Sequence, residues 1–447
     1  MLNARLALAL ALALSSQAAQ ANTPPPATRP YVIAASDGGA LLRLATGAQT
    51  CPSATVDGVS LPMAERSPPR QFPPRPSASG SAAAAPSAFP LRVCELTLPR
   101  GAKQASVVGQ PVPMIPATVR RIVLVGDTGC RLKQADAAWQ ACNDPQAWPF
   151  AQVARAAAAA KPDLVLHVGD YHYRENACPQ GNAGCAGSPW AYGWDAWNAD
   201  FFAPAAPLLA AAPWVVVRGN HEECARAGQG WWLLLDPHAL APNAACADPA
   251  QDGDANHTAP YAVELGGGAR LIVADFAALG EKALQGAALD RYRADAAQIR
   301  TLARAGDTNF VTAHYPFAAV VQKKGKLEIG SNAIGDAFDA ADRVPALPTV
   351  TAMLAGHVHM LQVAVVRGRP VQIVNGFSGT QEDAPKAPAN LAEARAAGAP
   401  AALADVFSQF GVFGFGLLER LSDGRWRYSA HDQHGKTLYS TIIARLP

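Results

Sequence analysis

The stretch RIVLVGDTG, residues 121–129, joins an uninterrupted apolar run to a polar turn that carries an aspartate. A short run of Val, Ile and Leu that ends in a Gly-containing turn predicts a buried β-strand. Asp127 then follows directly after the carboxyl end of this strand. In an open α/β sheet, binding sites form at this edge. The stretch therefore predicts an α/β fold with a polar site at one edge of a sheet.

Four later motifs also combine polar residues with apolar runs: Gly169-Asp170-Tyr171-His172-Tyr173, Gly219-Asn220-His221-Glu222, Val311-Thr312-Ala313-His314 and Gly356-His357-Val358-His359. With Asp127 they supply carboxylates, a phenol, an amide oxygen and imidazoles, the donors that a pair of hard-to-borderline metal ions needs. One motif alone is weak, because Gly-Asp is common in turns and a lone histidine usually belongs to the core or the surface. Five motifs in a consistent position relative to the strands predict one hydrolytic metal site.

Other apolar runs alternate with helical patterns and extend the predicted sheet. Short β-rich runs predict buried strands at residues 164–168, 214–217, 271–274, 310–313, 350–354 and 371–374. An alanine-rich segment, 149–160, predicts a helix that ends before Pro162, which gives a right-handed strand-helix-strand crossover between the first two motifs. Residues 413–418, 426–430 and 438–443 predict a closing antiparallel meander. The sheet is therefore expected to be mixed.

The composition divides the chain near Ala117. Residues 22–117 contain short predicted strands at 31–33, 40–44 and 91–98, which indicate a small β-rich N-terminal domain. Within it, residues 67–90 are so rich in Pro, Ser and Ala that they predict a disordered loop. Residues 118–447 hold all five motifs and are predicted to form the catalytic domain.

The chain begins with the features of a secretory signal peptide, residues 1–21. A short positive start precedes an alternating Leu/Ala run at 6–14, and Ala19-Gln20-Ala21 offers a cleavage site. The alternative is a membrane anchor, but this apolar run is far shorter than the roughly 20 residues of a spanning helix. We therefore expect cleavage after Ala21 and a periplasmic or secreted protein.

Charge and cysteine content fit an exported globular enzyme. The formal net charge is +2, which gives no electrostatic reason to expect nucleic acid or a membrane as a partner. Eight cysteines suit an oxidising compartment, and no C-x-x-C pair indicates a thiolate metal site. Eight cysteines leave many pairings open. Pairing of neighbours would give Cys51–Cys94, Cys130–Cys142, Cys178–Cys185 and Cys224–Cys246.

The five motifs resemble those of the calcineurin-like metallophosphoesterase superfamily. The purple acid phosphatase branch has the pattern G-D-x-G, G-D-x-x-Y, G-N-H-E, V-x-x-H and G-H-x-H, and all five parts are present between Gly126 and His359. The resemblance implies a four-layer αββα sandwich of two mixed sheets flanked by helices. A small β-rich N-terminal domain precedes this sandwich in the larger members of the branch.

The resemblance also implies how two metal ions would be held. One ion would be bound by Asp127, Tyr173 and His359, the other by Asn220, His314 and His357, with Asp170 as the bridge. The wider superfamily normally has a histidine ligand where this chain has Gly129, and Tyr173 replaces it. Because the Tyr173 site would collect anionic donors if the phenol ionises, it suits Fe(III). The second site suits Fe(II), Zn(II) or Mn(II), among which the ligand types discriminate poorly.

A centre of this kind hydrolyses small-molecule phosphate esters. Two ions would neutralise the phosphate and lower the pKa of a water, so that hydroxide attacks phosphorus in line. His221 resembles the family histidine that protonates the leaving group or holds the phosphate, and Glu222 is expected to orient it. Asn220 and His172 are further candidates for phosphate binding. We expect a phosphomonoesterase, with two alternatives: a phosphodiesterase or nucleotide hydrolase of the same fold, and a non-catalytic phosphate- or partner-binding protein that retains the fold.

The chain departs from the family pattern after His314. Plant and animal members tend to carry a further active-site histidine there, but residues 315–356 contain none. A lysine run in this segment is predicted to be a solvated surface rather than a phosphate site: Lys323, Lys324 and Lys326. A group of tryptophans could form an aromatic rim or, more commonly, cover the core: Trp190, Trp194, Trp197, Trp231 and Trp232.

Overall fold

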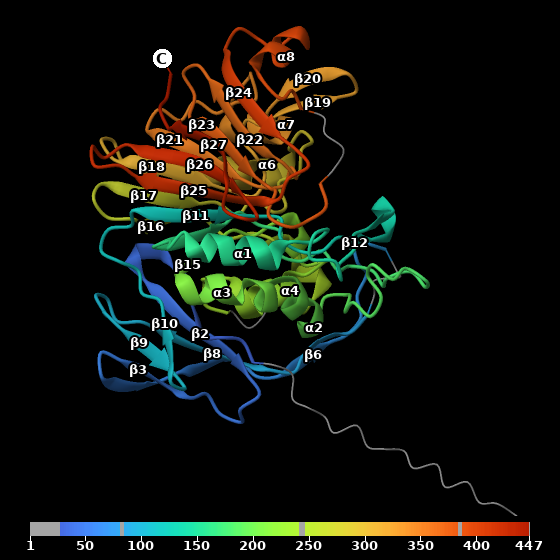
Figure 1. Cartoon of the computed structure of the whole chain (residues 1–447), viewed down its shortest axis with the longest axis vertical. Helices are drawn as coiled ribbons and strands as arrows, with labels where there is room; N and C mark the ends of the chain where they lie inside the picture. Colours follow the sequence, from blue (N-terminus) through green and yellow to red (C-terminus); the bar gives the residue numbers. More distant parts are fainter. Residues whose placement is uncertain (1–26, 81–84, 241–245, 383–386, 447) are drawn as a thin grey trace, which may run out of the picture.

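Figure 1 shows a computed structural model of the chain, in which residues 27–80, 85–240, 246–382 and 387–446 are described. The predicted signal peptide, residues 1–21, and its cleavage site lie outside the described residues. Two large mixed sheets lie face to face, with helices on their outer sides. Among the described residues, no helix is both long and apolar enough to cross a membrane.

The first sheet has ten strands. In spatial order they are β27 (Thr437–Ile442), β26 (Trp426–Asp432), β25 (Gly414–Arg420), β11 (Arg121–Val125), β14 (Leu164–His167), β15 (Trp214–Val216), β1 (Tyr31–Ala34), β2 (Ala40–Thr46), β8 (Arg92–Thr97) and β5 (Ala64–Ser67). The central strands β11, β14, β15 and β1 are parallel, and antiparallel strands flank them on both sides.

The second sheet has seven strands. In spatial order they are β16 (Tyr261–Glu264), β17 (Ala269–Val273), β18 (Thr308–Thr312), β21 (Val350–Ala355), β23 (Val371–Asn375), β22 (Leu361–Val366) and β24 (Leu403–Gln409). Strands β17, β18, β21 and β23 are parallel, whereas β16, β22 and β24 pair antiparallel with their neighbours. Both sheets are therefore mixed.

Alternation of side chains along the strands creates separate cores on the two faces of each sheet. Leu124 of β11 packs between the sheets with Leu271 and Phe310, whereas Val123 of the same strand packs on the outer side. Helices α1 (Phe150–Ala159) and α3 (Ala203–Ala211) cover that outer side. Helices α6 (Gly286–Leu302) and α7 (Asn332–Phe338) cover the outer side of the seven-stranded sheet. This confirms the predicted four-layer αββα fold class.

The predicted central elements are present. The six buried strands expected after residue 160 correspond to β14, β15, β17, β18, β21 and β23, and the closing meander corresponds to β25, β26 and β27. The expected crossover helix is α1, between the parallel strands β11 and β14. These segments follow the prediction because continuous apolar runs are needed where both faces of a strand are buried.

The N-terminal region is β-rich, as expected, but it shares a sheet with the rest of the chain. Strand β1 pairs in parallel with β15 through Ile33 and Trp214, so the ten-stranded sheet runs across the predicted boundary near Ala117. A separate four-stranded sheet packs against β1 and β2: β10 (Gln110–Val112), β9 (Ala105–Val107), β3 (Ser53–Val56) and β4 (Val59–Pro62). The division into domains 22–117 and 118–447 stays a prediction.

The described part of segment 67–90 has a definite structure, contrary to the expectation of a disordered loop. Strands β6 (Arg70–Phe72) and β7 (Ser87–Phe89) pair antiparallel. Phe72 and Phe89 are buried, and their ring centroids lie 6.0 Å apart. Arg75 forms an ion pair with Asp252. A few apolar and charged anchors therefore fix a segment whose average composition predicts disorder.

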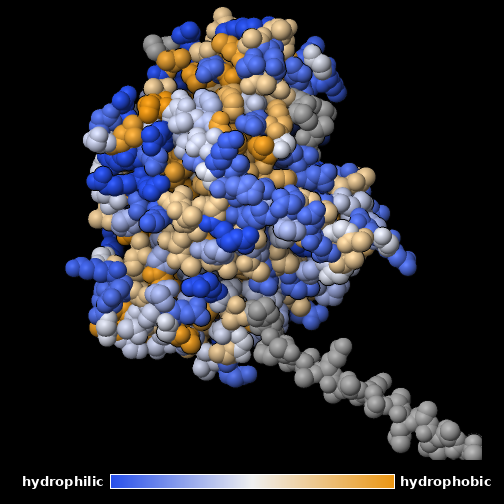
Figure 2. Space-filling view, in the orientation of Figure 1, coloured by the Kyte–Doolittle hydropathy of each residue, from blue (hydrophilic) through white to orange (hydrophobic). Residues whose placement is uncertain are grey.

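The short remaining elements lie mainly in the loops. They are β12 (Leu132–Lys133), β13 (Ala138–Trp139), β19 (Val320–Lys323), β20 (Lys326–Ile329), α2 (Trp194–Trp197), α4 (Gly228–Gly230), α5 (Asp252–Ala255) and α8 (Leu391–Ala396). Figure 2 shows hydrophilic and hydrophobic residues interspersed over the face drawn there. Scattered apolar residues of this kind are ordinary for a folded protein surface.

The four disulfides are those expected from neighbour pairing. They are Cys51–Cys94, Cys130–Cys142, Cys178–Cys185 and Cys224–Cys246. The last three lie on loops that follow the first three polar motifs. Covalent closure of these loops restricts the unfolded chain and holds the residues next to the site.

Candidate metal centre

All five motifs meet at one edge of the two facing sheets. Asp127, Asp170 and Asn220 follow β11, β14 and β15 of the ten-stranded sheet, whereas His314 and His357 follow β18 and β21 of the seven-stranded sheet. These strands are parallel within each sheet, so their carboxyl ends bring the loops together. The structure therefore gathers residues that are far apart in the sequence.

One group of donors surrounds the phenol of Tyr173. Its Oη donates toward Oδ1 of Asp127 at 3.0 Å and Oδ2 of Asp170 at 2.8 Å. The same Oη lies 2.8 Å from Nε2 of His359. Tyr173 is 1% exposed, and burial followed by the charges of Asp170 and Asp127 holds its pKa well above the usual range. A phenol here ionises only if a cation takes the place of its proton.

The second group of donors surrounds the amide oxygen of Asn220. Its Oδ1 lies 3.1 Å from Nε2 of His314 and 3.1 Å from Nδ1 of His357. Nδ1 of His314 lies 2.9 Å from the carbonyl oxygen of Val168, which leaves Nε2 directed into the centre. This group consists of an amide oxygen and two imidazoles, all neutral ligands when they bind a metal.

Asp170 lies between the two groups. Its Oδ2 is 2.8 Å from Tyr173 Oη and 3.2 Å from His314 Nε2. Burial opposes the charge on His314, but the Asp170 carboxylate raises the pKa of His314 to about 9. One carboxylate oxygen of Asp170 therefore lies next to donors of both groups.

The residues fit a buried cation site. Among the described residues, donor atoms of Asp127, Asp170 and His314 lie within 4.8 Å of one another, and all three side chains are buried. Carboxylates at this depth need a positive partner, because burial without one is costly. A metal cation would supply that positive partner.

Sharp backbone turns aim these side chains. Asp127, Asp170 and His357 adopt left-handed conformations with φ of 54°, 58° and 69°. Such conformations are unfavourable for residues other than glycine and persist at functional sites where the surroundings fix them. Gly219 is needed for close approach, since a Cβ there would lie 2.1 Å from Oδ1 of Asp170.

The structure explains why a ligand side chain cannot occupy position 129. A Cβ on Gly129 would lie 2.8 Å from Oδ2 of Asp200, from the carbonyl of Tyr171 and from the amide of Tyr173. Asp200, which is fully buried, accepts hydrogen bonds from the backbone N–H groups of Cys130 and Tyr173 and from Nε of Arg174. This carboxylate ties the first two motif loops together, and the sequence alone did not identify it.

His221 lies beside the Tyr173 group. Their ring centroids are 3.8 Å apart, and Nε2 of His221 is 3.8 Å from Oδ2 of Asp170. Nδ1 lies 3.0 Å from the carbonyl of His172 and 2.9 Å from Oε1 of Glu175. Burial, followed by the charge of Arg226, lowers the pKa of His221 to about 4. The ring is therefore held through Nδ1, with Nε2 on the side of the donor groups.

Glu222 does not orient His221 through its carboxylate, contrary to the expectation. Oε1 accepts the backbone N–H groups of Tyr171 and His172, and Oε2 accepts those of Asp170 and Gly219. Burial and the charge of Asp170 raise the pKa of Glu222 to about 8. Glu222 instead joins the second and third motif loops.

Glu175 and Arg226 are the groups that contact the His221 ring. Nη2 of Arg226 lies 2.8 Å from Nε2 of His221 and forms an ion pair with Oε1 of Glu175. Burial opposes the charge on Glu175, but Arg226 and His221 hold its pKa well below the usual range. Neither residue was predicted from the sequence, although Glu175 lies only two positions after Tyr173.

Other candidates lie away from the donor groups. The His172 ring is fully buried and packs near Tyr192 and Trp197, with centroids at 5.5 and 5.8 Å, so only its backbone carbonyl faces His221. His167 is fully buried, with Nε2 3.0 Å from Oγ1 of Thr128. Four of the tryptophans cover the core rather than a rim: Trp194, Trp197, Trp231 and Trp232.

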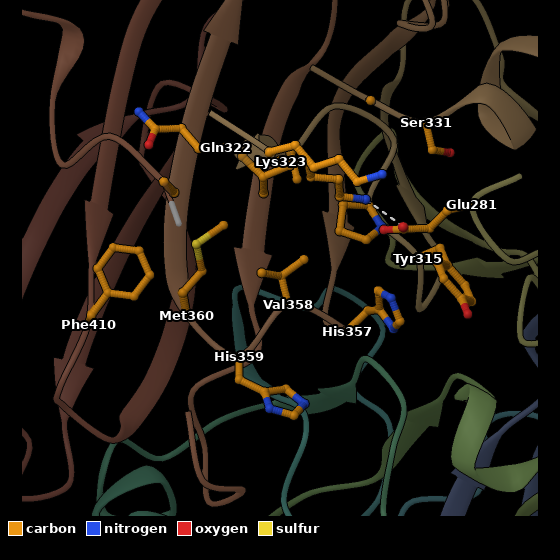
Figure 3. Close-up of a pocket in the computed structure, with 16 residues that line it drawn as sticks. Glu281, Tyr315, Gln322, Lys323, Ser331, His357, Val358, His359, Met360 and Phe410 are labelled. Atoms are coloured by element: carbon orange, nitrogen blue, oxygen red, sulfur yellow. Dashed lines mark hydrogen bonds and ion pairs between the residues drawn. The ribbon is translucent and has the colours of Figure 1, made fainter. Parts of the chain in front are cut away.

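A pocket of about 660 Å³ opens beside the donor groups (Figure 3). His357 and His359 line one end of it. Phe410 and Met360 line an apolar side, whereas Lys323 lies on a polar side. Lys323 is partly exposed and pairs with Glu281 at 2.5 Å, so the predicted surface character of the lysine run holds for this residue, although it borders the pocket.

The family model of the calcineurin-like phosphoesterases matches residues 120–361 of the chain. This match covers more than half of the sequence and all five motifs, and the chain belongs to this family. It is therefore a phosphoesterase, a hydrolase of phosphate esters. A search of the curated proteins finds no match.

A comparison with solved structures finds matches to phosphatases. Purple acid phosphatase PPD1 from yellow lupin (Lupinus luteus) seeds aligns with a TM-score of 0.56 at 13% identity, over 94% of this chain and 74% of that chain. A structure of PhoD aligns with a TM-score of 0.48 at 11% identity, over 94% and 92% of the two chains. A dimetal phosphatase from Danio rerio has a TM-score of 0.38 at 12% identity, over 73% and 99%. The lupin structure shares the fold of this chain.

Proposed function

We propose that this protein is an exported phosphomonoesterase of the purple acid phosphatase type with two metal ions. The main support is the position of Asp170, whose Oδ2 lies within 3.2 Å of donors from both groups. Two separate donor groups joined by one carboxylate suit two ions better than one. The Asp127, Tyr173 and His359 group would hold Fe(III), since phenolate is a hard anionic donor, and the Asn220, His314 and His357 group would hold Fe(II), Zn(II) or Mn(II).

When bound, the two ions would neutralise the phosphate and supply a water of lowered pKa. The chain's own residues bind and orient the substrate. If Oδ1 of Asn220 binds the second ion, the amide N–H of the same side chain can donate to a phosphate oxygen. Nε2 of His221 lies on the same side, 3.8 Å from Oδ2 of Asp170. Nη2 of Arg226 contacts this nitrogen at 2.8 Å and would have to turn toward the phosphate before Nε2 could carry a proton. A bound phosphate dianion favours the protonated imidazole, which can then protonate the leaving oxygen.

Glu175 and Arg226 act as positioning residues in this proposal. The carboxylate fixes the Nδ1 side of His221, and the guanidinium balances the charge of the carboxylate. Because both side chains are buried, removal of either one leaves an unpaired charge next to the ring. Their loss should therefore weaken the alignment of His221 without removing a donor to the metal ions.

Export is supported by the four disulfides, which suit an oxidising compartment. The predicted signal peptide would direct the protein out of the cytoplasm, to a periplasmic or secreted location. The expected partner is a small-molecule phosphate ester rather than nucleic acid or a membrane. Recovery of the mature protein from the periplasm or medium, starting near Asn22, tests this part directly.

The deciding experiment combines metal analysis, the visible spectrum and turnover of an aryl phosphate. Two ions per chain, iron among them, and a broad visible band that Tyr173→Phe abolishes would support the proposal. Tyr171→Phe is the matched control, because Tyr171 is equally buried but packs on His167 instead of the donor groups. Two other metals with full turnover and no band would remove the Fe(III) assignment. A loaded protein that turns over no phosphate ester would refute the proposal.

A further inference from the structure

The pocket beside the metal centre is continuous with the proposed reaction site. Its volume is about 660 Å³, and His357 and His359 belong both to its lining and to the two donor groups. Sites for drug-sized organic ligands have volumes of about 300–1,000 Å³. A phosphate alone fills a small part of this space. The remaining volume lies where the organic part of an ester would extend.

One side of the pocket is apolar. Phe410 follows the end of β24 and is half-buried. Phe410, Val321 and Val358 each pack against a small buried cluster that contains Met360. Figure 3 shows Phe410, Met360 and Val358 in sequence along this side, leading toward His357 and His359. An apolar surface in contact with a site for a charged group is expected where an amphiphilic ligand binds.

The opposite side is polar but contains a neutralised ion pair. Nζ of Lys323 lies 2.5 Å from Oε2 of Glu281, and both side chains are partly exposed, at 43% and 48%. Ser331 also lies on this side, and Lys324 belongs to the lining of the pocket. Exposed ion pairs contribute little binding energy because solvent screens them. The apolar side therefore offers the larger free energy for holding an organic group.

We propose that the pocket binds the organic group of the phosphate ester and that Phe410 makes the enzyme prefer esters with long or bulky apolar groups. This inference rests on the proposed function, since the phosphate must first be held by the metal centre. The preference comes from burial of methylene or ring surface against Phe410, Met360 and Val321. Each buried methylene contributes about 0.8 kcal/mol, or roughly fourfold in binding.

The test compares ethyl phosphate with hexyl phosphate, which have alkoxide leaving groups of similar basicity and differ in apolar length. For the wild-type protein we expect kcat/KM for hexyl phosphate to exceed that for ethyl phosphate by about tenfold or more. In Phe410→Ala the ratio should fall about fivefold, while kcat/KM for ethyl phosphate stays within about twofold. Full metal content and unchanged turnover of ethyl phosphate show that the variant is folded.

Two further variants make the test specific. Val321→Ala, on the same apolar side, should lower the ratio by about twofold. Lys324→Ala, at a charged residue of the same pocket lining, should leave the ratio unchanged, as should Val59→Ala, at an exposed position on the small N-terminal sheet. A wild-type ratio near one would overturn the inference, and so would a ratio that responds to Lys324→Ala but not to Phe410→Ala. In both cases cleavage of ethyl phosphate leaves the proposed function intact, whereas cleavage of neither ester refutes both.

Discussion

The two sheets contribute different kinds of residue to the metal centre. Loops of the ten-stranded sheet provide the anionic groups, and three of them are closed by disulfides. Loops of the seven-stranded sheet provide three imidazoles. All strands of this sheet lie after Cys246, the last cysteine of the sequence, so none of its loops is closed by a disulfide. The pocket opens beside the histidines that the seven-stranded sheet contributes, His357 and His359.

The difference follows from the cost of burying charge. Asp127 and Asp170 are buried carboxylates, and further buried carboxylates, Asp200 and Glu222, hold their loops through backbone N–H groups. Such groups must be fixed closely, because a misplaced buried charge is costly. Neutral imidazole ligands carry no buried charge, so they need only the correct orientation toward the metal. We infer that loops of the ten-stranded sheet fix the charged metal ligands, whereas loops of the seven-stranded sheet supply neutral ligands and also determine which ester enters the pocket.

The strongest test of this division is Asp170→Asn. Loss of the shared carboxylate should empty both donor groups and lower kcat/KM for an aryl phosphate by more than about 10⁴-fold. Metal analysis and turnover measure this, with Asp136→Asn as a control, since Asp136 pairs with Arg131 and Lys133 at the surface. Two ions retained per chain would show that Asp170 does not bridge.

His221→Ala separates chemistry from metal binding within the ten-stranded half. Metal content should stay complete while kcat falls about 10³-fold, because a proton donor is lost but no proposed metal ligand is removed. Glu175→Gln should lower kcat less, by about tenfold, because Gln can still accept a hydrogen bond from Nδ1. Parallel loss of metal in His221→Ala would mean that the residue has a structural role.

Removal of the Cys224–Cys246 disulfide tests whether closure of a loop next to the site supports metal binding. Replacing both cysteines with Ser should lower the free energy of unfolding by about 3 kcal/mol and weaken the metal group that contains Asn220. The matched variant without Cys51–Cys94 should lose similar stability but keep its metal ions, because that bond lies in the N-terminal region. Urea unfolding and metal titration distinguish the two. Equal metal loss in both variants would contradict a local effect.

Lys323→Ala should have the smallest effect. The Lys323–Glu281 pair on the seven-stranded side is partly exposed, so its loss should change the free energy of unfolding by less than about 0.5 kcal/mol. Metal content should not change. If urea unfolding showed that the free energy of unfolding falls by more than about 2 kcal/mol, the loops of the seven-stranded sheet would be as constrained as the disulfide-closed loops of the ten-stranded sheet.

The buried parallel strands and the motifs that follow them could be predicted because their signals are local. Residues 164–168 form a continuous apolar run, and Asp170 lies directly beyond it. Strand β24 was not predicted, because Asp405, Ser408 and Gln409 interrupt its apolar residues without regular alternation. The pairing of β1 with β15 was also missed, since nothing in Tyr31 to Ala34 specifies which distant strand lies beside it.

The supporting residues of the site were harder to predict than the donors. Asp200 and Glu222 act on backbone N–H groups, and Arg226 meets Glu175 across 51 positions. Such contacts depend on the folded path of the chain rather than on spacing within a motif. The predicted donors and His221 come together in the structure, whereas the ring of His172 packs elsewhere because successive residues of an extended segment face opposite ways.

The place of β1 in the middle of the ten-stranded sheet has a consequence for the order of folding. Its neighbours are β2, a few residues away, and β15, which is synthesised much later. Contacts of such large sequence separation form slowly, because a long loop must close before they are gained. Until β15 arrives, β1 has an open edge able to pair with another chain. The nascent protein therefore needs to be kept apart from its own copies until the chain has been made as far as β15, in the first third of the predicted catalytic region.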